Sequence, residues 1–165
     1  MGMSYLRFGG MIAVSVLVMY GLTYLNVFEP AHIRFSQTRV WMALIMGSAM
    51  AAVMLGFMWK MYGNRTANIA ILAAAALVFA LSLWLMRSQA LVDDLAYMEA
   101  MIPHHSIAIL TSENAHIRDP RVRELADGII EAQVREIGEM ENLIASLRQS
   151  PVPAGAPDLP PRPAD

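Results

Sequence analysis

A short segment of the chain combines side chains that bind soft metal ions. On a helix, Met98, Met101 and His105 occupy positions i, i+3 and i+7, so they project from one face. His104 lies beside them. Thioether sulfur prefers soft ions such as Cu(I) to hard cations, and neutral imidazole binds the same ions. These four residues are therefore predicted to be copper or silver ligands; the alternative is two methionines that fill a core beside two histidines.

Three residues further along the chain complete the candidate site. Met140 supplies a possible third thioether, whereas Gln133 and Glu136 interrupt the apolar face of a predicted helix. A buried polar group without a partner costs on the order of 1–3 kcal/mol, so a purely structural face would carry Leu there. We expect Gln133 and Glu136 to orient the Met and His ligands, because a directly bound carboxylate would favour harder ions. The alternative is that both are rim residues bonded to each other or to water.

The composition excludes several classes of protein. Of the 165 residues, 56% are hydrophobic and only 16% are charged, which is too apolar for an ordinary soluble domain of this length. The chain has no Cys, so disulfides and thiolate ligands are excluded and any soft ligand is Met or His. The formal net charge of -2 offers no basic surface for nucleic acid. Part of the chain is therefore predicted to lie in a membrane.

Three apolar runs have the length of a membrane-spanning helix, about 20 residues. They cover residues 8–28, 40–61 and 67–86. The break at 29–39 carries Pro and charged residues, and the break at 62–66 carries Gly and Asn, as turns at a membrane surface do. Residues 1–87 are therefore predicted to form a membrane domain with three transmembrane helices.

The orientation of these spans in the membrane is predicted from a small number of basic residues at their ends. Arg7, Lys60 and Arg65 lie on one side of the membrane, and Arg34, Arg39 and Arg87 lie on the other. Lys60 and Arg65 bracket a very short loop, and acidic residues follow Arg87; both features favour an amino terminus in the cytoplasm. We therefore expect a multi-pass protein of the inner (cytoplasmic) membrane whose carboxy-terminal domain is extracytoplasmic.

The second apolar run carries a ridge of methionines, one at every fourth residue. They are Met42, Met46, Met50, Met54 and Met58. Such a ridge either packs between the small residues of neighbouring helices or guides soft ions towards the His and Met cluster. The only charged side chain of the run is Lys60 near its end, so the interior of this helix offers no path for protons or hard ions.

Residues 88–149 are predicted to form a helical hairpin. Its first arm has an apolar seam at alternating four- and three-residue spacing, and the seam includes His105. The chain breaks at 114–119, where Asp119 can cap a second helix that begins with a proline. The predicted seam of that second arm comprises Val122, Ala126, Ile129, Gln133, Glu136, Met140, Leu143 and Leu147. If the arms run antiparallel with equal rise, Met101 lies level with Gln133 and Met98 with Glu136.

Pro103 lies inside the first arm and frees one backbone carbonyl there. It either kinks this helix beside the proposed ligands or marks a join between two helices. The pair Glu113 and His116 matches one Glu-x-x-His element of carboxylate-bridged di-iron bundles, but it stands alone beside the hairpin turn. The tail at 150–165 holds six of the nine prolines and is predicted to be extended and disordered.

Two patterns in the hairpin resemble a known family. Met-Ile-x-His-His at 101–105, followed by Ile-x-x-x-Gln-x-x-Glu-Ile-x-x-Met at 129–140, is similar to the repeat of the domain-of-unknown-function 305 family. The resemblance covers residues 91–148. It implies a ferritin-like helical domain, usually extracytoplasmic, and copper or silver binding by Met and His in some members. Most such proteins carry two copies of the unit in one chain, whereas this chain carries one.

The predicted architecture is all-α: three transmembrane helices followed by a ferritin-like helical hairpin that dimerises into a four-helix bundle. A homodimer is expected because a lone hairpin buries little apolar surface. We interpret the chain as a membrane-anchored protein that binds copper or silver in metal homeostasis or resistance, with no catalytic step. The alternative is a small membrane scaffold or accessory subunit of a membrane complex whose hairpin mediates assembly. An oxidoreductase with a carboxylate-bridged metal pair is a third and more distant reading.

Overall fold

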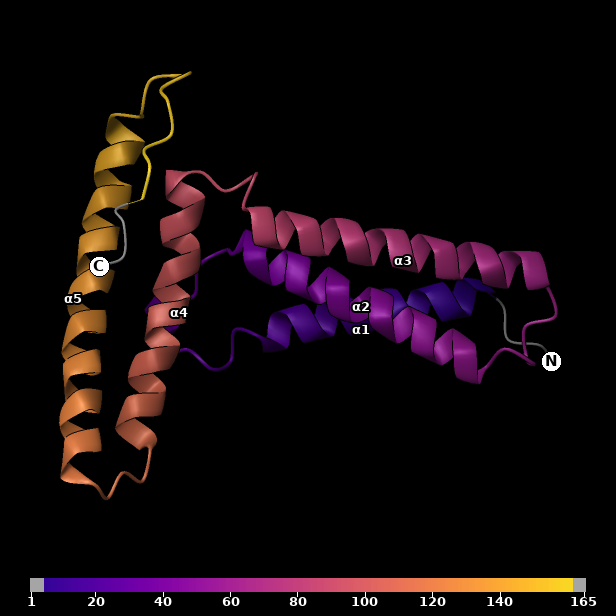
Figure 1. The fold of residues 1–165 in the computed structure, drawn as a ribbon, viewed down its shortest axis with the longest axis horizontal. Helices are drawn as coiled ribbons and strands as arrows, with labels where there is room; N and C mark the ends of the chain where they lie inside the picture. Colours follow the sequence, from indigo (N-terminus) through magenta and orange to yellow (C-terminus); the bar gives the residue numbers. More distant parts are fainter. Residues whose placement is uncertain (1–4, 162–165) are drawn as a thin grey trace.

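The computed structural model describes residues 5–161, and this part of the chain contains helices and no strand. The elements are α1 (Tyr5–Leu22), the 3-10 helix η1 (Pro30–His32), α2 (Gln37–Phe57), α3 (Arg65–Ser88), α4 (Asp94–Asn114) and α5 (Pro120–Gln149). Helix α2 packs against both α1 and α3, and α4 packs against α5. The α4–α5 hairpin lies across one end of the elongated bundle that α1, α2 and α3 form (Figure 1). The all-α prediction is confirmed for the described residues.

Helices α1, α2 and α3 are each long and apolar enough to cross a membrane. The side chain of Ser36 caps α2 by accepting from the amide of Arg39, and that of Asn64 caps α3 by accepting from the amide of Ala67. Their core consists of Phe8, Ala51, Leu55, Tyr62 and Ala75. A Cβ on Gly47 would collide with Val16 of α1, so the glycine allows these two helices to approach closely.

Helix α1 ends at Leu22, six residues before the end of the apolar run that predicted it. The remaining apolar residues leave the helix to reach the hairpin. Phe28 packs against the hairpin core, and its amide donates to Oγ of Ser106 at 2.7 Å. The prediction of a span to residue 28 was wrong because apolar composition does not distinguish contact with lipid from contact with another part of the protein.

The hairpin core draws equally on both arms. Its fully or largely buried side chains are Met98, Ile102, Ile109, Ile137, Met140 and Ile144. Asp119 caps α5 through the amide of Arg121, and Pro120 begins the helix, as the sequence predicts. Helix α4 runs through Pro103 without interruption, so this proline joins no separate helices.

The predicted seam of α5 is partly wrong. Val122, Ile129 and Leu143 are exposed to 50%, 37% and 48%, whereas Ile137 and Ile144 take part in the core. Apolar residues of α5 spread over more of its circumference than one partner helix covers. Consequently α4 buries the side of this apolar face that carries Ile137 and Ile144, and the side that carries Val122, Ile129 and Leu143 stays exposed.

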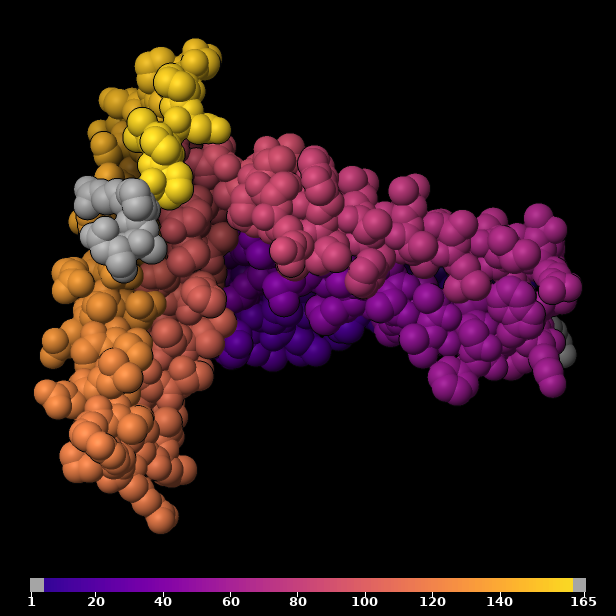
Figure 2. Space-filling view, in the orientation of Figure 1, coloured from indigo at the N-terminus to yellow at the C-terminus, as the bar shows by residue number. Residues whose placement is uncertain are grey.

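Contacts far apart in the sequence fix the hairpin to the end of the membrane bundle. Ser106 of α4 is fully buried, and its Oγ lies 3.0 Å from Nδ1 of His32 as well as accepting from the amide of Phe28. On α5, Glu141 forms an ion pair with Arg34 at 3.1 Å. These contacts hold α4 against the segment between α1 and α2, with α5 as the outer layer (Figure 2).

After α5, residues 151–161 form neither helix nor strand and are exposed throughout. Their prolines lack the amide hydrogen that regular structure needs. The ends of two predicted segments, residues 1–4 of the membrane domain and 162–165 of the tail, lie outside the described residues.

Candidate functional site

The imidazole of His105 is buried between the two arms of the hairpin and is held at both ring nitrogens. Its Nδ1 lies 3.0 Å from the carbonyl oxygen of Met101, one turn earlier in α4. Its Nε2 lies 2.8 Å from Oε2 of Glu136 on α5. A carbonyl oxygen and a carboxylate oxygen both accept hydrogen bonds, so each ring nitrogen faces an acceptor, and Nε2 is the nitrogen that faces the second arm.

Glu136 therefore meets His105 and not Met98, the residue that equal helical rise places at its level. The physical reason is the lean of helical side chains towards the amino terminus of their own helix. That direction carries His105 away from the hairpin turn and carries Glu136 towards it, so two residues at different levels converge. That Glu136 orients a ligand stays a prediction, and His105 is the predicted ligand that it contacts.

Thioethers from both arms share the hydrophobic core next to this pair. Met98 and Met140 are only 6% and 9% exposed and belong to the same buried cluster. Met101 is half-buried and packs against that cluster, one turn before His105. The structure thus gathers the three predicted Met residues in one hydrophobic cluster, which also includes Ile102 and Ile109 on either side of His105 in α4.

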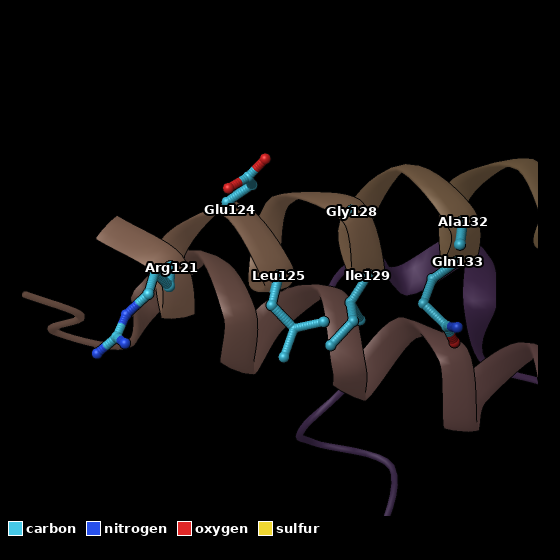
Figure 3. Close-up of a pocket in the computed structure, with 7 residues that line it drawn as sticks. All are labelled: Arg121, Glu124, Leu125, Gly128, Ile129, Ala132 and Gln133. Carbon is cyan, nitrogen blue, oxygen red and sulfur yellow. The ribbon is translucent and has the colours of Figure 1, made fainter. Parts of the chain in front are cut away.

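Two of the predicted site residues lie further out. His104 is exposed, and its ring centroid is 6.3 Å from that of His105, because neighbouring helical residues diverge by about 100°. Gln133 is half-buried and borders a shallow surface hollow with Ile129 and Leu125 (Figure 3). Neither residue contributes a hydrogen bond to the His105–Glu136 pair.

Other candidate ligand groups do not converge. Within residues 5–161 no three side chains of His, Cys, Asp or Glu come together as a possible metal site. Glu113 and His116 are both exposed at the end of α4 and in the turn after it. The methionine ridge of α2 is split, since Met42 and Met46 are exposed and Met54 packs in the core of the membrane helices.

Sequence reasoning missed Ser106, His32 and Phe28. These residues join the hairpin to the segment between α1 and α2, beside the position of His105 in the chain. Ser106 is more than 70 positions away from both His32 and Phe28, so no periodicity within one helix relates them. The one available signal was Ser106 itself, a polar residue on the apolar side of a helix, which needs a partner when it is buried.

Comparisons with known proteins cover the hairpin. The family model described as "Domain of unknown function (DUF305)" matches residues 94–162. A relative from Acanthamoeba polyphaga mimivirus, "Uncharacterized protein L153", is 45% identical over 60 residues, which are 35% of this chain and 40% of that protein. The chain therefore spans less than half the length of this relative. No solved structure matches the chain. Residues 94–162 of this chain are thus similar to the DUF305 family, and they follow three helices that are long and apolar enough to span a membrane.

Proposed function

We propose that the hairpin binds a soft monovalent metal ion, Cu(I) or Ag(I), in metal homeostasis or resistance. One observation carries this proposal: Met98, Met101 and Met140 lie in one hydrophobic cluster, and His105, on the same helix as Met98 and Met101, turns Nε2 towards Glu136 of the second arm. Thioethers stay unprotonated at every pH and bind hard cations poorly. This donor set therefore fits a soft ion and does not fit Mg²⁺, Ca²⁺ or Mn²⁺.

The residues divide into ligands and a supporting group. Met98, Met101, Met140 and His105 would hold the ion, and the carbonyl of Met101 would keep the imidazole in the tautomer whose Nε2 is free to coordinate. Glu136 occupies Nε2 in this structure, so a bound ion would take its place at that nitrogen. Exposed His104 would act as an outer ligand that delivers or releases the ion.

The three helices that are long and apolar enough to cross a membrane support a membrane location. We propose a multi-pass protein of the cytoplasmic membrane, with the amino terminus inside and the hairpin outside the cytoplasm, where it meets incoming metal. The hairpin is fixed to the bundle through Ser106 and the ion pair of Arg34 with Glu141. In this role the protein binds and holds the ion and performs no catalytic step.

The competing function is a membrane scaffold whose hairpin mediates assembly. The exposed half of the apolar face of α5 favours it, because Leu125 and Leu143 are 66% and 48% exposed. On that reading the methionines and His105 only pack the hairpin.

Metal content separates the two functions. The full chain, purified in detergent and challenged separately with Cu(I), Zn²⁺ and Fe²⁺, should retain about one Cu(I) per chain, and X-ray absorption should detect sulfur ligands. Retention of no metal after the Cu(I) challenge supports the scaffold. Retention of iron with oxygen and nitrogen ligands alone contradicts the soft-metal proposal.

A further inference from the structure

One lateral face of α5 is open along most of the helix. A stripe of residues spaced three or four positions apart marks this face. We call it the lateral stripe; it comprises Arg121, Leu125, Gly128, Ala132, Arg135, Glu139 and Leu143. Each of these residues is exposed or half-exposed in the described chain. This spacing is the one that two packed helices use along their seam.

The lateral stripe is hollowed near its centre. A shallow depression of about 550 Å³ is lined by residues of α5 alone, among them Leu125, Gly128 and Ala132. Figure 3 shows Leu125 and Ile129 pointing to the side of the hairpin where α4 lies, whereas Glu124 points away. A Cβ built on Gly128 meets no atom within 4 Å, so the space above this glycine is empty. Exposed Leu side chains around an empty centre suit a second helix.

We propose that a second copy of this chain docks on the lateral stripe, with the two α5 helices antiparallel about a two-fold axis. The charges of the stripe select this pairing. When Gly128 of one copy lies opposite Ala132 of the other, equal rise places Arg121, which also pairs with Asp119 of its own chain, opposite Glu139. Symmetry then forms this pair of opposite charges twice, at the two ends of the contact. A parallel pairing would set each charge against itself.

Small residues at the centre let the two helices approach closely. Gly128 and Ala132 face each other across the axis, and Leu125 covers the aliphatic stem of Arg135 in the other copy. Burial of an exposed Leu in this contact contributes a favourable free energy of about the size that it contributes in a protein core. The stripe is thus apolar and small in the middle and charged at its ends.

The orientation of the hairpin relative to the membrane fits this symmetry. The hairpin lies across the end of α1, α2 and α3, so its flanks face sideways along the membrane surface (Figure 1). A two-fold axis along the membrane normal brings two such flanks together and reverses the direction of α5. It also keeps the membrane helices of both copies in the same membrane, as a dimer requires.

The flank that carries the lateral stripe is free of contacts with the membrane bundle. Glu141, which binds Arg34, lies about half a turn away from the stripe on α5. Glu136 lies next to the stripe, and its side chain is 43% exposed although it holds the nearly buried ring of His105. A second copy would therefore shield the His105–Glu136 pair from water. This inference does not depend on the metal proposal.

Glycine substitutions test the contact with a matched control. Gly128→Gln and Gly138→Gln place the same side chain on α5, and neither Cβ meets an atom within 4 Å of it in the single chain. Gly138 lies outside the stripe. Native mass spectrometry of the full chain, with the detergent mass subtracted, should find a dimer for the parent and for Gly138→Gln. Gly128→Gln should raise the dimer dissociation constant at least about tenfold, with the helix content unchanged.

Charge reversal tests the antiparallel register separately. Arg121→Glu alone and Glu139→Arg alone each set like charges against each other, so each should weaken the dimer several-fold. The double variant restores opposite charges and should recover the dissociation constant of the parent. A monomeric parent chain overturns the proposal and leaves the stripe to another protein. A dimer that Gly128→Gln leaves intact, or one that the double charge reversal fails to restore, overturns it as well.

Discussion

The Nε2 atom of His105 lies 2.8 Å from Oε2 of Glu136, and the same ring is held at Nδ1 by the carbonyl of Met101. One histidine therefore connects the backbone of α4 to a carboxylate of α5 across the hairpin. The histidine is nearly buried, whereas the carboxylate is partly open to water. In the proposed metal-bound state, a soft ion at Nε2 would displace the carboxylate of Glu136 and leave the contact with the Met101 carbonyl, which would keep the ring orientation unchanged.

Removal of the Glu136 carboxylate should strengthen Cu(I) binding, because the carboxylate occupies Nε2, the nitrogen that the ion would take. Glu136→Ala frees Nε2, whereas the carbonyl of Met101 still holds Nδ1 and with it the orientation of the ring. Competition with a Cu(I) chelator of known affinity measures the effect. Glu131→Ala removes an exposed carboxylate from the same helix and is the control. Equal affinities for both variants would deny Glu136 any part in the site.

Loss of the Ser106 hydroxyl should loosen the hairpin from the membrane bundle. Ser106→Ala leaves the amide of Phe28 without its acceptor, at a cost of about 1–3 kcal/mol for a buried donor. Hydrogen exchange at the Phe28 amide should therefore quicken by one to two orders of magnitude. Thr111→Ala, which removes an exposed hydroxyl that bonds only within α4, should leave that amide protected. Unchanged exchange in Ser106→Ala would mean that other contacts hold this segment.

The cap of α5 should weaken in acid. Hydrogen bonds from the side chain and then the backbone amide of Arg121 hold the pKa of Asp119 below its usual value. A carboxyl whose pKa is lower in the folded state stabilises that state above the unfolded pKa, and the contribution is lost as pH falls through the folded pKa. Stability of the hairpin should thus decline below about pH 4. Asp119→Asn keeps a capping oxygen but cannot titrate, so its decline over this range should be smaller; an identical decline would remove Asp119 as a cause.

The amino terminus should lie in the cytoplasm and the hairpin outside it. A phosphatase that is active only outside the cytoplasm, fused after Ser150, should be active, because three spans place the two ends of the membrane domain on opposite sides. A fluorescent protein that folds only in the cytoplasm, fused at the same residue, should stay dark. The reverse pair of results would place the hairpin inside the cell.

Local signals predict the hairpin well. The turn after Asn114 and the start of α5 at Asp119 and Pro120 follow from capping chemistry, which acts within a few residues. Three membrane-length helices likewise follow from composition along the chain. The grouping of Met98, Met101 and His105 on one side of α4 follows from helical spacing alone.

Contacts between helices are harder to predict because one sequence pattern allows several. Helix α5 has apolar residues at adjacent positions such as Leu143 and Ile144, and spacing does not decide which of the two faces α4. The contact of His105 with Glu136 depends on how far each side chain leans along its helix axis. A register worked out from helical rise alone does not include this lean. Phe28 lies outside the first membrane helix, and its amide donates to Ser106, a residue 78 positions away.

Cu(I) affinity of the Met98→Leu, Met101→Leu double variant tests the proposed function most directly. Leu keeps the volume and apolarity of Met, so the hairpin should lose less than about 1.5 kcal/mol per substitution and keep its fold. Chelator competition on the full chain should show a loss of Cu(I) affinity of at least about tenfold, since two thioethers leave the site. Met42→Leu, Met46→Leu in α2 is the matched control and should bind as the parent does. If the hairpin double variant and a His104→Ala, His105→Ala variant both bind Cu(I) with the parent's affinity, the hairpin is not the metal site and the scaffold function takes its place.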